Sequence, residues 1–119
     1  MPHLTLEYTA NLAIDPAAAL TAINAAAFDS GLFGEADIKS RALCLGDFRT
    51  GVQTGARAFA HLRIALLSGR SADERKQLAN AALAALMATL VPPAGHELQL
   101  SVETVELDRA SYAKAVVHG

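Results

Sequence analysis

The chain has 119 residues, the length of one ordinary domain with a single hydrophobic core, and we treat residues 1–119 as that domain. Its formal net charge is −2, and it has neither a basic stripe nor an RNA-binding aromatic motif, so we expect no nucleic-acid partner. It has no basic opening followed by an apolar run of signal-peptide length and no membrane-length segment, so we expect a soluble cytoplasmic protein.

The cysteine and alanine contents bear on the compartment of the protein and on the size of its core. The one cysteine, Cys44, excludes an internal disulfide and fits a reducing cytoplasm; we expect it to be a buried strand residue. Apolar residues make up 52% of the chain, but 26 residues are alanines, which form good helices and thin cores. Because one chain has little large apolar surface, association of several chains would be a natural way to bury more.

The first half of the chain predicts a strand, a helix and a second strand. Leu4 and Leu6 alternate with polar residues, as in a half-buried strand. Asp15-Pro16 is a typical helix start, with the aspartate as N-cap and the proline in the first helical position. The expected elements are a strand at about 3–8, a helix ending near Phe28 and a strand at 37–45.

The second half repeats this order after a glycine-rich loop at 46–56. Ser71 and Glu74 have the spacing of a capping box, so a helix begins there, and Val91-Pro92-Pro93 ends it. The expected elements are an alternating strand at 57–67, a helix from 71 to about 90 and a strand at about 97–106.

This order indicates a duplicated β-α-β unit, with pseudo-repeats at about 1–46 and about 57–107. Parallel strands joined by crossover helices place both helices on one side of the sheet. We therefore expect an α+β fold, a four-stranded mixed sheet with two helices on one face. The other face, either solvated or covered by partner subunits, would carry a mixed polar set: His3, Thr5, Glu7, His61 and Arg63.

Pro2 is the first candidate catalytic residue. Methionine aminopeptidases usually remove the initiator methionine when a small residue follows, so the mature chain would begin with Pro2 and carry a free secondary amine. Such an amine acts as a base if its surroundings lower its pKa towards neutral. The alternative is an ordinary Met-Pro start with no chemistry attached.

Three stretches resemble the tautomerase superfamily. Residues 60–76, AHLRIALLSGRSADERK, are similar to the 4-oxalocrotonate tautomerase pattern of a strand, Gly-Arg-Ser and a charged helix start. The opening Met1-Pro2-His3 and the segment Ile38-Lys39-Ser40-Arg41 resemble one branch, 5-carboxymethyl-2-hydroxymuconate isomerase, which has an arginine-rich strand there. The similarity extends to about Glu106.

The resemblance implies a tautomerase/MIF-like fold and an isomerase that needs no metal, nucleotide or flavin. By this resemblance, Pro2 takes the proton from the 2-hydroxyl of a 2-hydroxymuconate-type dienol diacid and returns it to a distant carbon, giving the conjugated ketone. The substrate would be a small carboxylate from the breakdown of aromatic compounds. Three chains would associate around their sheets as a homotrimer.

Three cations are candidates for substrate binding. Arg70 precedes a helix N-terminus and matches the family's carboxylate-binding arginine; alternatively it is a solvated loop residue or pairs with Asp73 or Glu74. Lys39 and Arg41 would share one strand face, where two cations are otherwise a solvated edge or an intersubunit ion pair. Lys39 stands where the family has arginine, and a lysine grips a carboxylate less firmly than the arginine fork.

Other activities stay open at this point. Another superfamily reaction, such as phenylpyruvate-type tautomerisation or dehalogenation, would use the same Pro2. A non-catalytic trimeric binding module would keep the scaffold alone. The four histidines share no metal-ligand spacing, so we expect no metal site: His3, His61, His96 and His118.

Overall fold

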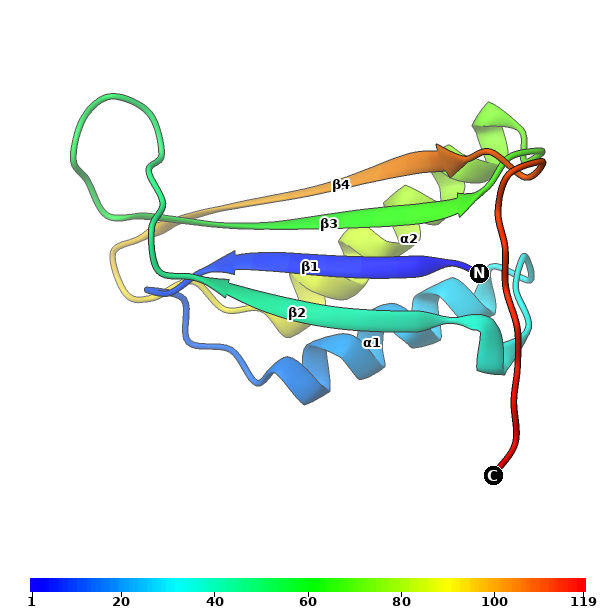
Figure 1. Ribbon diagram of the computed structural model, residues 1–119. Coiled ribbons are helices and arrows are strands. Elements are labelled where there is room, and N and C mark those ends of the chain that lie inside the picture. Colours follow the sequence, from blue (N-terminus) through cyan, green and yellow to red (C-terminus); the bar gives the residue numbers. More distant parts are fainter.

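The computed structural model describes residues 1–119 and has two helices packed on one face of a four-stranded sheet (Figure 1). The elements are β1 (His3–Thr9), α1 (Pro16–Asp29), the 3₁₀ turn η1 (Glu35–Asp37), β2 (Lys39–Leu45), β3 (Arg57–Leu67), α2 (Ala72–Thr89) and β4 (Glu97–Leu107). The predicted α+β fold with a mixed sheet is confirmed. Neither helix is long and apolar enough to span a membrane.

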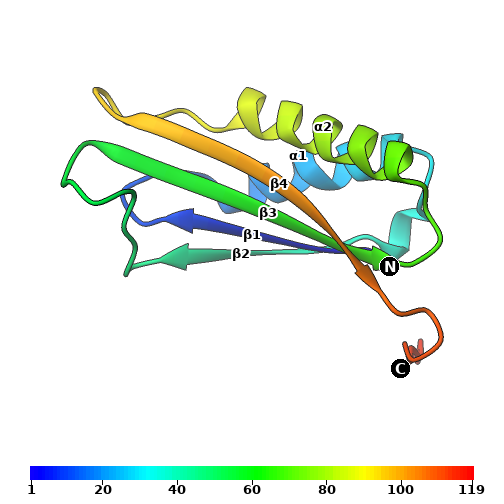
Figure 2. The same ribbon diagram turned by 90° about the horizontal axis from the view of Figure 1, so that it is seen from above.

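The sheet has the strand order β2-β1-β3-β4. β1 pairs with β2 in parallel and β3 pairs with β4 in parallel, so each half of the chain contributes two parallel strands joined by a helix. The halves meet through the antiparallel pair β1 and β3, in which His3 lies opposite Ala65. Seen from above, both helices lie on the same side of the sheet (Figure 2).

Both helices begin where the sequence predicts, because a side chain caps each first turn. Asp15 Oδ1 accepts a hydrogen bond from the Ala18 backbone N–H at 3.3 Å. Ser71 Oγ accepts one from the Glu74 N–H at 3.1 Å, and Glu74 Oε1 accepts one from the Ser71 N–H at 2.9 Å. This completes the predicted capping box.

The core lies between the helices and the two central strands. Alternate residues of β1 and β3 point into it and are fully or almost fully buried: Leu4, Leu6, Leu62, Ile64 and Leu66. Single stripes of the helices cover them, formed by Ala19, Ile23 and Ala27 of α1 and by Leu78, Ala82 and Leu86 of α2. The period-2 and helical patterns of the sequence therefore account for the core.

Two predictions about β2 need correction. Cys44 is exposed rather than buried, because β2 is an edge strand and its residues lack a neighbouring strand on one side. The strand begins at Lys39 rather than residue 37, since η1 takes up the residues through Asp37. Lys39 is consequently the first residue of the strand that lies alongside β1.

The C-terminal segment, residues 108–119, leaves the end of β4 and crosses the sheet at the start of β1 and β2 (Figure 1). The chain's first residues and the end of β3 lie at that same end of the sheet. The loop 46–56 lies at the opposite end (Figure 1). One end of the sheet therefore gathers the N-terminus, the turn after β3 and the C-terminal segment.

We predict that Leu62→Ala lowers the free energy of unfolding by about 2–5 kcal/mol, because it removes buried methyl groups and leaves a cavity at the centre of the core. Met87→Ala, at a position 65% exposed on α2, should change it by less than about 0.5 kcal/mol. Denaturant unfolding at one fixed protein concentration measures both. Similar losses in the two variants would contradict the assigned core.

Candidate active site

Pro2 immediately precedes β1 and its side chain is fully buried. The first backbone bond to β2 runs from the Lys39 N–H to the Pro2 carbonyl oxygen at 3.1 Å. Met1 precedes it and lines a cavity of about 150 Å³. Because Met1 is bonded to the Pro2 nitrogen, its removal would leave that nitrogen facing the space that Met1 occupies.

The cavity beside Met1 combines apolar walls with charged groups. Leu32 and Phe33 come from the loop after α1, while Leu66 and Leu67 come from the end of β3. Its charged residues are Asp37, Arg70 and Arg109. Apolar walls with a few convergent polar groups are typical of small-molecule sites, which have volumes of about 300 Å³ or more, and removal of Met1 would enlarge this cavity towards that size.

Arg70, predicted as a carboxylate-binding residue, lines this cavity. Its Nη2 donates to the Leu32 carbonyl oxygen at 2.6 Å, and its guanidinium carbon lies 5.8 Å from the centroid of the Phe33 ring. No ion pair joins it to Asp73 or Glu74, the alternative partners named from the sequence. The loop after α1 thus holds the guanidinium in place and leaves its positive charge unpaired.

Lys39 and Arg41 share one face of β2, as predicted, and both are exposed. The Lys39 Nζ donates to the Asp37 carbonyl oxygen at 2.9 Å. Arg41 lies two residues after Lys39 along β2 and therefore further from Pro2. Its Nη2 is 2.5 Å from the His3 Nδ1. Neither side chain lines the cavity that holds Arg70, so within one chain the predicted cations lie in two groups.

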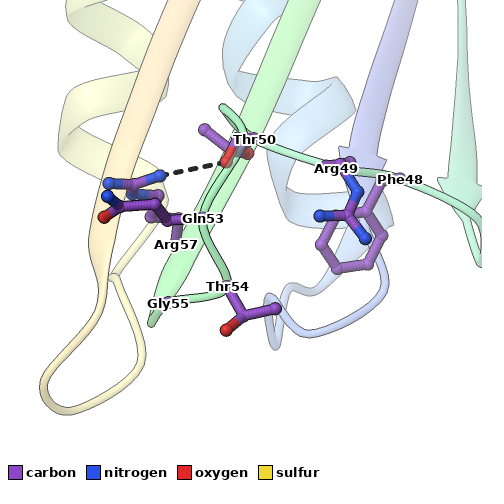
Figure 3. Close-up of a pocket in the computed structure, with 7 residues that line it drawn as sticks. All are labelled: Phe48, Arg49, Thr50, Gln53, Thr54, Gly55 and Arg57. Carbon is purple, nitrogen blue, oxygen red and sulfur yellow. Dashed lines mark hydrogen bonds between the residues drawn. The ribbon is translucent and has the colours of Figure 1, made fainter.

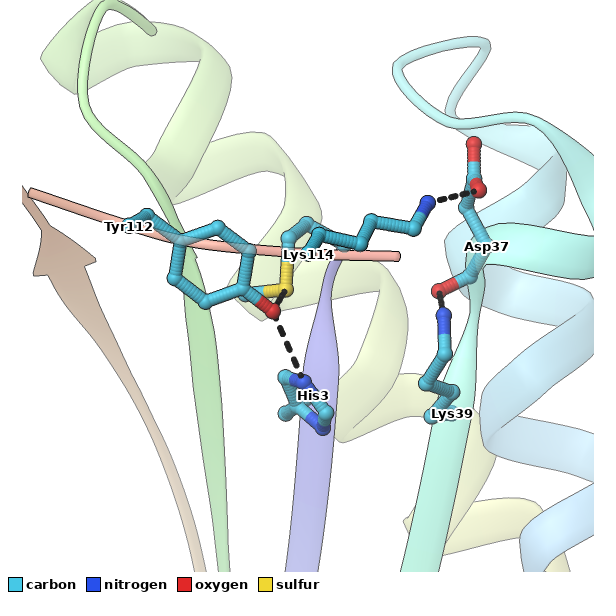
Figure 4. Close-up of polar contacts among 6 residues, drawn as sticks. His3, Asp37, Lys39, Tyr112 and Lys114 are labelled. Atoms are coloured by element: carbon cyan, nitrogen blue, oxygen red, sulfur yellow. Dashed lines mark hydrogen bonds and ion pairs between the residues drawn. The ribbon is translucent and has the colours of Figure 1, made fainter. Parts of the chain in front are cut away.

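The C-terminal segment closes over the N-terminus (Figure 4). The Tyr112 hydroxyl donates to the Met1 Sδ at 2.7 Å and lies 3.3 Å from the His3 Nε2. The Lys114 Nζ pairs with the Asp37 Oδ1 at 3.0 Å. Sequence reasoning missed these contacts, because the segment has no regular structure and its polar residues have no motif spacing.

The N-terminal amine has an environment that disfavours its charged form. Burial lowers the pKa of the Met1 amine below its ordinary value, and the Lys39 charge lowers it further; Asp37 opposes and Lys114 adds a smaller lowering. Burial likewise lowers the pKa of His3, with Arg41 and then Lys39 contributing. This end of the sheet therefore favours a neutral amine at the chain start.

A second cavity, of about 630 Å³, lies at the same end of the sheet beneath the C-terminal segment, and His3, Lys39 and Tyr112 are among the residues that line it. A cavity of about 180 Å³ lies within the loop 46–56, far from Pro2, where the Arg57 Nη1 donates to the Thr50 carbonyl oxygen at 3.0 Å (Figure 3). Figure 3 shows the Arg49 side chain well apart from that of Arg57. His61 lies on the open face of the sheet, 2.7 Å from the Ser101 Oγ and hydrogen bonded to Glu103. No group of metal-binding side chains converges in the structure.

Comparison with known proteins identifies the class. A sequence profile of the family described as 5-carboxymethyl-2-hydroxymuconate isomerase matches residues 2–119. The crystal structure of a 5-carboxymethyl-2-hydroxymuconate isomerase from Deinococcus radiodurans R1 is 31% identical with a TM-score of 0.79, and the match covers 96% of this chain and 88% of that one. No sequence among the curated proteins is similar enough to count as a match.

Two further solved structures share the fold at lower identity. A 5-carboxymethyl-2-hydroxymuconate delta-isomerase is 19% identical with a TM-score of 0.74, and the match covers 100% of this chain and 89% of that one. A fused 4-OT protein, described as a symmetric trimer, is 20% identical with a TM-score of 0.74, and the match covers 95% of this chain and 91% of that one.

These findings define an isomerase of the tautomerase superfamily. Since the profile match spans all but the first residue, the chain belongs to the 5-carboxymethyl-2-hydroxymuconate isomerase family. The resemblance read from the sequence is confirmed.

Proposed function

We propose that this protein is a cofactor-independent isomerase that converts a 2-hydroxymuconate-type dienol diacid into its conjugated ketone. Pro2 is the general base after removal of Met1, and Arg70 together with Lys39 or Arg41 holds the substrate carboxylates. One observation carries the proposal: the chain start lies beside a cavity with the unpaired Arg70 guanidinium. Burial and Lys39 lower the pKa of the Met1 amine there, and we expect the same surroundings to act on the Pro2 amine once Met1 is removed.

The reaction moves one proton and changes no oxidation state overall. The Pro2 nitrogen accepts the proton of the 2-hydroxyl, and the oxygen forms the C2 carbonyl as the double bonds shift along the chain. The protonated Pro2 then donates to carbon 5, giving the 2-oxo-3-ene product. Because the same nitrogen removes and returns the proton, the base is regenerated in each turnover.

Cations at the site have two effects in this mechanism. They disfavour the protonated amine, which keeps the base neutral, and they stabilise the enolate and the carboxylates by charge-assisted hydrogen bonds. Arg70 offers a planar fork for a carboxylate, whereas Lys39 offers a point charge. We also propose, as the resemblance implies, that the reaction belongs to the breakdown of aromatic compounds in the cytoplasm.

We also propose that three chains associate into a homotrimer through the open face of the sheet. The open face of the sheet carries Leu43 of β2, which is 49% exposed and lies opposite Glu7 of β1. His61 of β3 lies opposite Glu7 on its other side. The trimeric relative supports three copies, and in such an assembly a partner chain would cover this face and bury Leu43. A neighbouring chain would then supply cations to the cavity of Arg70, which Lys39 and Arg41 of the same chain do not line.

We expect Pro2→Ala to lower kcat/KM by about 10²- to 10⁴-fold, the usual contribution of a general base, with unchanged circular dichroism. Mass spectrometry first establishes that Met1 is absent from both proteins. A preparation that retains Met1 is the control, since its Pro2 nitrogen is an amide and should be equally inactive. Assays with a dicarboxylate dienol and a monocarboxylate enol separate the proposed reaction from phenylpyruvate-type tautomerisation. Turnover preserved in Pro2→Ala would exclude Pro2 as the base.

The pH dependence of kcat/KM tests the role of Lys39. The base works only when neutral, so activity rises with pH through the pKa of the Pro2 amine. The Met1 amine has a lowered pKa at this end of the sheet, and we expect the same surroundings to lower that of the Pro2 amine. The rise should then lie at lower pH than the titration of an unstructured peptide beginning Pro-His-Leu. Lys39→Met removes a positive charge, so the rise should move to higher pH, while Lys39→Arg should keep it in place. Lys76→Met, on the exposed side of α2, is the control. An unmoved rise in Lys39→Met would refute the electrostatic role.

Sedimentation equilibrium should give three times the chain mass of 12.4 kDa. Leu43→Lys should weaken the assembly, because it places a charge where the proposed interface buries an apolar side chain. Val52→Lys makes a similar change at a loop position that is 92% exposed and should have no effect. A wild-type monomer at micromolar concentration would count against the trimer.

A further inference from the structure

The C-terminal segment places a second guanidinium, that of Arg109, in the cavity beside Met1. Two bonds hold this residue to the turn after β3. The Arg109 backbone N–H donates to the Ser68 Oγ at 3.3 Å, and its Nε donates to the Ser68 carbonyl oxygen at 3.1 Å. Its Nη2 lies 3.9 Å from the position that a Cβ on Gly69 would occupy, and Gly69 is the residue before Arg70 in the sequence.

The terminal nitrogens of Arg109 are free for a ligand. They have no hydrogen bond or ion pair to another residue, since the only side-chain bond uses Nε. Arg70 also directs only one nitrogen, Nη2, to a protein acceptor. Two guanidinium groups that line the same cavity and have no ion pair form a site for anionic oxygens.

The one acidic side chain that lines the cavity does not cancel this charge. Asp37 pairs with Lys114 at 3.0 Å, and that ammonium, through its hydrogen bond and its charge, holds the pKa of the Asp37 carboxyl below its usual range. The pair is neutral as a unit, so the two arginines keep their positive charge. Arg70 and Arg109 line the cavity beside Met1, and the charge of Lys39 acts on the Met1 amine from the start of β2.

The proposed function assigns only two of these cations to the ends of a muconate. A carboxymethyl substituent, as in the substrate for which the family is named, adds a third carboxylate. Resting on that proposed function, we propose that Arg109 is a specificity-determining residue whose guanidinium binds the additional carboxylate. The fork of an arginine matches a carboxylate with two parallel N–H donors, which a simple anchor for the C-terminal segment would not need.

The test compares two substrates that differ only in that group, 5-carboxymethyl-2-hydroxymuconate and 2-hydroxymuconate. Arg109→Gln should raise KM for the first by about 10- to 100-fold, the loss of a charge-assisted hydrogen-bonded pair, with kcat changed less than about threefold. KM for the second should stay within about twofold. Arg109→Lys should recover only part of the loss, because a lysine keeps the charge but not the fork.

Arg49→Gln is the matched control, because it removes the same charge from an exposed loop residue at the opposite end of the sheet. It should leave both KM values unchanged. An equal rise of KM for the two substrates in Arg109→Gln would mean that Arg109 contributes only to the overall positive potential or stabilises the turn after β3. The proposal would then be wrong. No rise for either would also overturn it.

A binding measurement separates this proposal from the proposed reaction. Titration calorimetry with adipate and with 2-carboxymethyladipate, which cannot tautomerise, measures recognition of the third carboxylate alone. The wild type should prefer the tricarboxylate and Arg109→Gln should lose that preference. If the wild type prefers the tricarboxylate and Arg109→Gln does not, but neither dienol is turned over, the isomerase proposal is rejected and the binding role of Arg109 stands. If the dienols are turned over but the wild type shows no preference for the tricarboxylate, the isomerase proposal stands and the role of Arg109 is rejected.

Discussion

The antiparallel pairing of β1 with β3 is the constraint on which the rest of the structure depends. It places two strands with alternating leucine and isoleucine side chains at the centre of the sheet, so their inner faces meet both helices and form the core. The register sets His3 opposite Ala65, which brings the start of the chain beside the turn that follows β3. A shift by one residue would expose the buried set and also separate Pro2 from Arg70.

The same end of the sheet concentrates positive charge around the N-terminus. Arg70 comes from the turn after β3, Lys39 from the start of β2 and Arg109 from the segment after β4, so three connections converge there. Such convergence would destabilise a protonated amine and attract a polyanion, and both consequences suit a neutral base that acts on a carboxylate. Asp37 pairs with Lys114 at the same end, so these two charges offset each other and the other cations keep theirs.

The sequence predicts the fold well because its signals are local. Alternation over 57–67, the cap at Asp15 and the capping box at Ser71 each depend on a few neighbouring residues, and each element forms as expected. Arg70 could be placed for the same reason, since a strand end and a helix start flank it. The exposure of Cys44 could not, because it depends on β2 being at the edge of the sheet, and strand order is not a local property.

Arg109 shows why part of the site escapes sequence reasoning. It stands in an irregular segment with no motif, and only the fold brings it to Ser68, 41 residues earlier in the chain. Its placement depends on β4 pairing in parallel with β3 to its last residue, Leu107 opposite Leu67, which delivers the following residues to the turn before α2. The chemistry proposed for the chain start can therefore be inferred from a motif, whereas the recognition proposed for Arg109 depends on where the last strand ends.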